Sequence, residues 1–332
     1  NAHHPAAYTK NSPSRVVGHT TKPRRRNISL ERILGYTADL SNAQTEEISR
    51  FVSLWQKSPH EVKLMFQGGL SPTLRPVAWQ LVSRSIEILE DNRGVYQFLI
   101  ESDSAHHQNI VMDTERTLPF IPNFSEDDQT KTNNVLNAYS NKDHVMGYSQ
   151  GMNYVVATLI RTGMEEEHAF WLLMRLMKGF SLERIYPSQY SVINECFIKY
   201  EKLLQIYSPA VYQHLSINLD VSPSFYMQQW FQTIFLYSQR MDLTLRVLDL
   251  MMIRKIEALF SVSIAIIQLA EKKLLSFVNS LQAISYLKEL NPEELPTEAI
   301  IETAVSYPDL LRQLAELEEQ SHHDPSDSCS LM

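Results

Sequence analysis

The sequence predicts an all-α fold, and three observations support this prediction. Apolar residues recur at three- and four-residue intervals along most of the chain, which is the period of an amphipathic helix. Alternation with the period of a strand is nearly absent, and no Asn-Gly or Asp-Gly pair marks a β-hairpin turn. Glycine accounts for only 9 of the 332 residues, so tight turns should be few. We therefore expect helices packed on helices.

The N-terminal part of the chain divides into a tail and a helical segment. Residues 1–27 are polar, contain several prolines and show little periodicity, which is typical of a disordered tail. Residues 28–67 are interpreted as a helical N-terminal extension. Within them, an apolar face between Ile48 and Trp55 predicts a helix.

The next helix is expected to begin near Ser71. Serine is a favoured N-cap residue, and Pro72 would occupy the first helical position. Further runs with helical spacing cover residues 165–180, 192–207, 222–238 and 244–275. Aromatic residues occupy several faces of the third run, which predicts a buried helix: Phe225, Tyr226, Trp230, Phe231 and Phe235. A C-terminal helical extension is expected over residues 290–320, followed by a tail at 321–332.

Composition and charge exclude several classes of function. Because 44% of the residues are hydrophobic, the chain can bury a large core as one domain or as two closely packed lobes. The formal net charge of −8 argues against broad binding to nucleic acid or to anionic membranes, because both need a sustained basic surface. The chain contains only two cysteines, Cys196 and Cys329, so we expect no disulfide framework. We expect the protein in a reducing compartment, the cytoplasm. The most apolar stretch, Ala258–Ala270, is too short to span a bilayer.

The sequence also lacks the common motifs by which an enzyme binds a nucleotide, binds a metal ion or activates a nucleophile. No glycine-rich loop of the P-loop or dinucleotide-binding type is present, so no nucleotide phosphate is cradled by backbone amides. No H-E-x-x-H or C-x-x-C spacing indicates a metal site, and no G-x-S-x-G turn indicates a nucleophilic serine. We therefore expect no cofactor or metal of the chain's own, and no chemistry carried out by the chain alone.

Three short stretches remain, and together they carry a resemblance. They read "LRPVAW" at Leu74–Trp79, "NIVMDTERTLP" at Asn109–Pro119 and "GYSQGM" at Gly147–Met152. Their order and spacing match the R-x-x-x-W, I-x-x-D-x-x-R and Y-x-Q signatures, and the sequence resembles the TBC-domain Rab GTPase-activating proteins. The resemblance covers residues 68–289 and implies a TBC-type multi-helix domain of two helical lobes.

The resemblance implies that Arg116 and Gln150 are catalytic residues supplied to a partner. The partner would be a GTP-bound Rab-family small GTPase, which would bring the GTP and Mg²⁺, so this chain would have no GTPase activity of its own. The chemistry suits these residue types. A guanidinium offers a planar fork of donors to phosphate oxygens. A glutamine amide can accept a hydrogen bond from the attacking water and donate one to the γ-phosphate.

Four further residues are expected to support the site. Asp113 would either hold the Arg116 guanidinium or cap a helix N-terminus, and both readings stay open. Tyr148 would either pack beside the catalytic residues or contact the GTPase. Arg75 and Trp79 lie one helical turn apart, and we expect Trp79 in the core and Arg75 in a buried or half-buried ion pair.

Some positions depart from the family pattern. These departures bear on which GTPase the chain would bind more than on catalysis. The usual G-I-P start reads Gly69-Leu70-Ser71, and the later W-D pair reads Leu248-Asp249. Two alternatives to an activating role stay in view. One is a non-catalytic TBC-type adaptor that binds a small GTPase, and the other is a helical interaction protein unrelated to GTPases.

The last four residues, Cys329 to Met332, fit a C-a-a-X lipidation box. Ser330 is not aliphatic and the preceding residues are acidic, so a lipidated Cys329 and an unmodified tail are both open. A single lipid chain would give weak, peripheral association with endomembranes.

Overall fold

The computed structural model describes residues 40–186, 190–307, 309–313 and 315–316. In these ranges every regular element is a helix and no strand occurs, so the predicted all-α class is confirmed. The expected tails, including Cys329, lie outside the described residues. No helix in the described part of the chain is long and apolar enough to cross a membrane.

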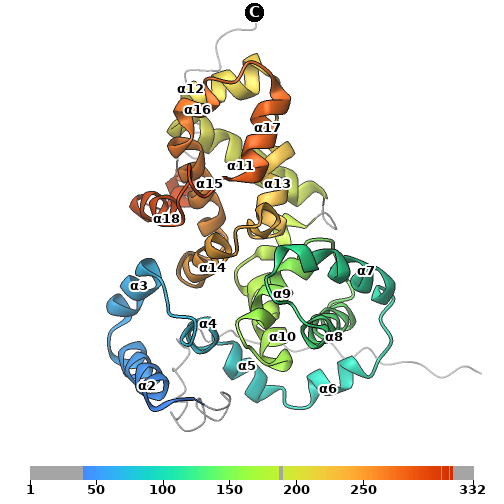
Figure 1. The fold of residues 1–332 in the computed structure, drawn as a ribbon. Helices are drawn as coiled ribbons and strands as arrows, with labels where there is room; N and C mark the ends of the chain where they lie inside the picture. The colour runs from blue at the N-terminus through green and yellow to red at the C-terminus, as the bar shows by residue number, and fades with distance from the viewer. Residues whose placement is uncertain (1–39, 187–189, 308, 314, 317–332) are drawn as a thin grey trace, which may run out of the picture.

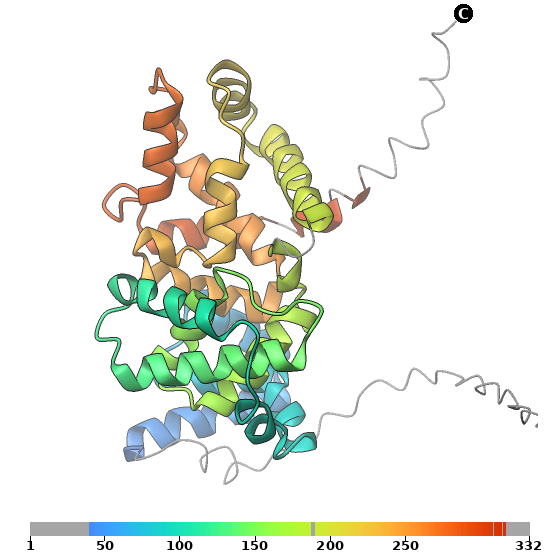
Figure 2. The same cartoon turned by 90° about the vertical axis from the view of Figure 1, so that its right-hand side faces the viewer.

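The molecule has two helical lobes, which Figures 1 and 2 place one above the other. The lower lobe and the helices beside it comprise α2 (Asn42–Lys57), α3 (Pro59–Gly68), α4 (Arg75–Ser83), α5 (Ser85–Asp91), α6 (Val95–Ile100), α7 (His107–Thr117), η1 (Leu118–Phe120), α8 (Glu126–Lys142), α9 (Met152–Arg161) and α10 (Glu166–Met174). The short helices η2 (Arg175–Gly179) and η3 (Leu182–Ile185) follow.

The upper lobe contains the second half of the described chain. Its helices are α11 (Tyr190–Tyr207), α12 (Pro209–Tyr212), η5 (Gln213–Asn218), α13 (Ser224–Gln232), η6 (Leu236–Ser238), α14 (Met241–Arg254), α15 (Glu257–Leu269), α16 (Glu271–Leu274), α17 (Ser280–Glu289) and α18 (Thr297–Ser306). In the middle of Figure 1, α14 packs against α3 and α4 and so joins the upper lobe to the N-terminal helices.

Each lobe is built around one helix that is buried on all sides. In the lower lobe this is α9, where every residue from Met152 to Ile160 is buried. In the upper lobe it is α15, buried from Ala258 to Ile267. Because a helix surrounded by neighbours has little freedom to tilt or slide, the start of α9 is a rigid point in the lower lobe.

Two local predictions need correction. The Ser71 hydroxyl accepts a hydrogen bond from the Leu74 backbone N–H at 3.2 Å, as an N-cap residue does, but a turn follows and α4 begins only at Arg75, so Pro72 is not its first residue. The run 244–275 is not one helix, because Lys255 adopts a left-handed φ of 55° and separates α14 from α15.

A third expectation failed for a single side chain. Most of the aromatic residues around α13 are buried, as expected, but Phe225 is 53% exposed. It lies in the first turn of the helix, next to the buried Tyr226.

Candidate functional site

Arg75 and Trp79 lie in a buried polar cluster centred on Asp249. The Arg75 Nη2 atom lies 3.1 Å from Asp249 Oδ2, and the Trp79 indole Nε1–H donates to Asp249 Oδ1 at 2.9 Å. Trp79 and Asp249 are both fully buried. These contacts join α4 to α14 inside the protein, as the expected core position of Trp79 and ion pair of Arg75 require.

Arg246 completes this cluster from its other side. Its guanidinium lies 3.7 Å from Asp249 Oδ2 and donates to the Gln67 carbonyl oxygen at 2.8 Å. Gly69, which has a φ of 94°, passes so close that an added Cβ would lie 2.6 Å from Arg246 Nη1. The glycine is therefore required by both backbone conformation and space.

Arg116 is presented to solvent from the last turn of α7. Its side chain is 63% exposed, and its Nη1 atom lies 3.2 Å from Asp113 Oδ1 one turn earlier. Asp113 lies inside α7 and not at its start, so it does not cap the helix. Two interpretations of Asp113 were left open, and the structure shows the contact with the Arg116 guanidinium and not the helix cap.

Gln150 lies in the turn immediately before α9 and is exposed. Its amide has no hydrogen-bond partner among the residues that the structure describes, so it is available to a ligand. Gly151 follows with a φ of 106°, and an added Cβ would lie 2.8 Å from the Gln232 carbonyl oxygen. Only glycine fits there, and its backbone conformation leads the turn that carries Gln150 into α9.

Asn153 connects the Gln150 turn to the end of α7. Its Nδ2 group donates to the Asp113 carbonyl oxygen at 3.0 Å and to the Thr117 hydroxyl at 2.7 Å. Its Oδ1 atom accepts from the Gly151 backbone N–H at 2.9 Å. Asn153 is 1% exposed, so these bonds form away from water, where an unmade hydrogen bond is costly. One buried amide thus holds together the segments that carry Arg116 and Gln150.

Tyr148 adds a second connection between the same segments. Its hydroxyl donates to Asp113 Oδ2 at 2.9 Å, on the carboxylate whose other oxygen faces Arg116. Burial, together with the negative charge of Asp113, raises the pKa of Tyr148, so its hydroxyl stays protonated and able to donate. Of the two roles considered for Tyr148, this geometry corresponds to packing beside Arg116 and Gln150.

A pocket of about 260 Å³ opens beside Gln150. It is lined by residues of α9, α13 and η6, which include Tyr154, Phe225, Gln229, Gln232 and Tyr237. Phe120 of η1 stacks on Tyr237 with a ring separation of 4.9 Å and lies edge-on to Tyr154 at 5.5 Å. The chain segment that follows Arg116 is therefore packed against the pocket wall beside Gln150.

Asp249, Asn153 and Phe225 were missed as site residues in the sequence. Asn153 carried a usable signal, since it is the only amide in the otherwise apolar run from Met152 to Ile160. Asp249 carried a weaker one, as the acidic member of the altered W-D pair. No group of three or more His, Cys, Asp or Glu in the described ranges could hold a metal ion.

Comparisons with known proteins identify the family of the chain. The sequence model of the Rab-GTPase-TBC domain family matches residues 72–275. The chain is 32% identical over 253 residues to the GTPase-activating protein GYP5 of Eremothecium gossypii, an alignment that covers 74% of this chain and 30% of the relative. It is 30% identical over 223 residues to the Rab GTPase-activating protein eat-17 of Caenorhabditis elegans, covering 66% of this chain and 24% of that protein.

A solved structure supports the fold. The flagellar RabGAP TBC domain of Chlamydomonas aligns with a TM-score of 0.68 at 23% identity, covering 82% of this chain and 98% of that domain. The chain spans less than a third of the length of the two curated relatives. Since the family model covers more than half of the sequence, the chain belongs to the Rab-GTPase-TBC domain family.

Proposed function

We propose that this chain accelerates GTP hydrolysis by a Rab-family small GTPase, to which it supplies Arg116 and Gln150. Hydrolysis of the γ-phosphate passes through a state with charge spread over several oxygens and an attacking water in line. Catalysis therefore consists mainly of positioning and of charge stabilisation, and two well-placed polar groups are enough. The GTP and Mg²⁺ belong to the GTPase in this proposal.

Arg116 would stabilise the negative charge that develops on the phosphate oxygens. The guanidinium remains charged when it is removed from water, and its planar fork matches a pair of phosphate oxygens. Asp113 holds one edge of the guanidinium, at Nη1. A partner that replaces the solvent around this side chain would meet its remaining N–H groups.

Gln150 would orient the attacking water. Its amide oxygen can accept from the water while its NH₂ group donates to the γ-phosphate. This task is usually performed by a glutamine of the GTPase itself. The exposed turn before α9 can present the amide to another protein's active site, because Gly151 holds the backbone in a conformation that other residues rarely adopt.

One observation carries the proposal: two exposed polar side chains, Arg116 and Gln150, stand on segments tied together by a single buried network. Asn153, Asp113 and Tyr148 form that network. An arginine and a glutamine that only faced water would not need a buried hydrogen-bond network beneath them. Pre-organisation of this kind is what stabilises a transition state without reorganisation at the moment of reaction.

The test is phosphate release from a panel of GTP-loaded Rab proteins, with and without this chain. We expect at least one member to be accelerated, and Arg116→Lys to remove most of that acceleration. Lysine keeps the positive charge but cannot reproduce the fork, and removal of an arginine finger costs about 10³ to 10⁵ in rate. Glu115→Gln is a matched control, because Glu115 is an exposed neighbour on α7 without a role in the network.

The outcomes separate activation from the alternatives. If Arg116→Lys kept more than about a tenth of the acceleration, the role of Arg116 would be wrong. Tight binding to a GTP-loaded Rab without any acceleration would point to the adaptor. No binding to any member of a complete panel would point away from GTPases.

A further inference from the structure

The turn between α16 and α17 exposes a cluster of large apolar side chains. Val278 is 82% exposed, Leu281 is 78% exposed and Leu275 is 39% exposed. Isolated exposed apolar residues are ordinary in soluble proteins, but these three lie close together in the sequence at one end of a lobe. We refer to Leu275, Val278 and Leu281 as the apolar turn.

The sequence around the apolar turn carries no charge. No Asp, Glu, Lys or Arg occurs from Leu274 to Leu287, although these four types make up 20% of the whole chain. A surface turn that only faced water would be expected to contain some of them. An uncharged, apolar surface segment is instead typical of an interaction site.

The structure holds this turn in a defined shape. The Phe277 carbonyl oxygen lies 2.9 Å from His214 Nε2, and the Phe277 ring packs on Tyr286 with a ring separation of 5.5 Å. Asn279 caps α17 by accepting from the Gln282 backbone N–H at 3.0 Å. Leu274, directly before the apolar turn, is fully buried. Phe277 and Leu274 therefore anchor the segment, while the residues of the apolar turn remain outside.

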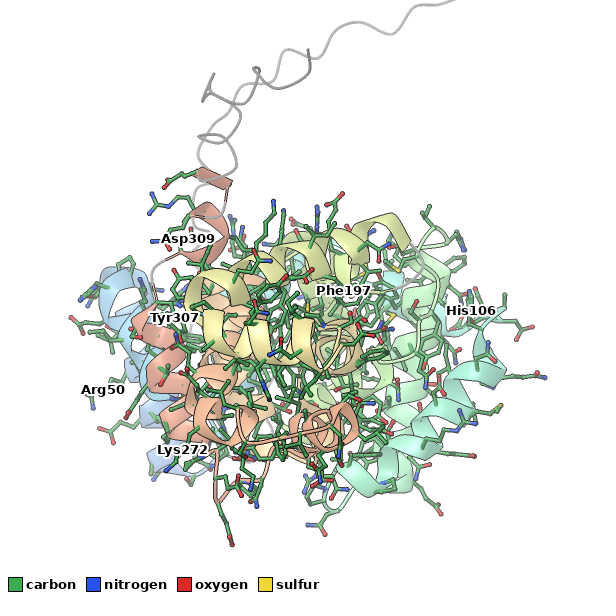
Figure 3. The ribbon with its side chains drawn as sticks, turned by 90° about the horizontal axis from the view of Figure 1, so that it is seen from above. Arg50, His106, Phe197, Lys272, Tyr307 and Asp309 are labelled. Carbon is green, nitrogen blue, oxygen red and sulfur yellow. The ribbon has the colours of Figure 1, made fainter. Side chains whose placement is uncertain are left out.

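The basic residues at this end of the molecule stand directly before the apolar turn. Lys272 and Lys273 are exposed and lie on α16. Figure 1 places α16 and α17 at the upper end of the molecule, and Figure 3, which looks down on this end, labels Lys272. Glu289 and Glu294 line a hollow on one flank of α17 together with Lys273 and Phe277, and Glu271 begins α16, so acidic groups lie beside the two lysines.

We propose that the apolar turn inserts into the surface of an anionic lipid bilayer, with Lys272 and Lys273 against the lipid headgroups. Two observations favour a membrane over a protein partner. The exposed residues sit on a turn at the end of a lobe and not in a groove, which suits a flat surface. The flanking lysines complement the negative charge of anionic lipid, and each basic residue near such a surface adds to binding.

The expected binding is weak and reversible, because only three apolar side chains and two charges take part. The proposal does not rest on GTPase activation. A lipid-binding assay needs no GTPase, and phosphate release from a soluble GTPase needs no lipid, so each can fail without the other.

The experiment is co-sedimentation of the full chain with vesicles of phosphatidylcholine alone or of phosphatidylcholine mixed with phosphatidylserine. The protein carries Cys329→Ser, so a lipid anchor cannot contribute. Leu281→Asp removes an exposed apolar contact in the first turn of α17, where an added acid favours the helix. Phe98→Asp is the matched control, because Phe98 is 69% exposed and lies on α6 in the lower lobe.

We expect the parent protein and Phe98→Asp to sediment equally with the mixed vesicles, and Leu281→Asp to lose on the order of tenfold in partitioning. Lys272→Gln combined with Lys273→Gln should remove the preference for mixed vesicles over phosphatidylcholine. No sedimentation of the parent protein, or equal sedimentation of Leu281→Asp, would overturn the proposal. So would a dimer in solution that Leu281→Asp dissociates, because the apolar turn would then bind a second copy.

Discussion

Asp249→Ala should be the most destabilising substitution in the buried cluster between the lobes. Asp249 is fully buried, and its carboxylate faces two guanidinium groups, Arg75 at 3.1 Å and Arg246 at 3.7 Å. Without it, the Arg75 guanidinium stays buried with no counter-charge, Arg246 keeps only its ion pair with Glu298 at 3.1 Å, and the Trp79 indole N–H loses its acceptor. Removing one member of a buried ion pair costs about 3 to 5 kcal/mol.

That cost should appear as a large fall in melting temperature. For a domain of this size, about 1 kcal/mol corresponds to about 2 to 4 °C, so the expected decrease is roughly 6 to 20 °C. Thermal unfolding followed by circular dichroism measures it. The control is Asp127→Ala, which removes a surface ion pair with Lys131 and should cost less than about 1 kcal/mol.

If Asp249→Ala melts within a degree or two of the Asp127→Ala control, Asp249 does not stabilise the buried cluster as described. A variant that melts normally but no longer activates a GTPase would also contradict this role. Asp249 would then belong to the functional surface and not to the joint between α4 and α14.

Two further predictions concern buried polar groups. Asn153→Ala should slow phosphate release about a hundredfold, because a small misplacement of catalytic groups has that effect, while affinity for the GTP-loaded GTPase stays the same; a loss of affinity equal to the loss of rate would contradict its positioning role. Burial lowers the pKa of His168 to about 4 from its ordinary value of 6.5. Between pH 4 and pH 6.5, His168 of the unfolded chain therefore binds a proton that His168 of the folded chain does not. Stability from His168 is therefore present above pH 6.5 and is lost as the pH falls toward 4, by up to about 3 kcal/mol. Unfolding in urea should show a shallower loss across this window for His168→Gln than for the parent, and identical slopes would refute the assignment.

The helical fold could be predicted because its signal is repeated along the chain. The apolar face from Ile48 to Trp55 is a local pattern, and it gave α2 with an error of a few residues at its start. The break at Lys255 has no such signal, because neither glycine nor proline stands there. Tertiary contacts lie at this point: the neighbouring Arg254 guanidinium donates to the carbonyl oxygens of Ala304, Val305 and Tyr307 at the end of α18.

The candidate site could be predicted only as far as its motifs reach. Arg116 and Gln150 could be named as candidates because each stands in a short, recognisable stretch. The network behind them was not, because it depends on the packing of α7 against α9, and Asn153 contacts residues 36 and 40 positions away. In the same way, the acceptor shared by Arg75 and Trp79 lies on α14, 174 and 170 positions further along the chain.

The most direct test of the account uses a GTPase whose own switch glutamine has been replaced by leucine. Such a variant lacks the amide that normally orients the attacking water. If Gln150 supplies that amide, this chain should still accelerate phosphate release from the GTP-loaded variant. Gln150→Ala should abolish the acceleration while leaving the melting temperature unchanged, since Gln150 is exposed.

Single-turnover phosphate release, measured with the parent and with Gln150→Ala on both forms of the GTPase, gives the answer. We expect the parent to accelerate phosphate release from both forms of the GTPase, and Gln150→Ala to accelerate it from neither. Acceleration of the normal GTPase together with complete loss on the leucine variant would contradict it, because the catalytic amide would then come from the GTPase.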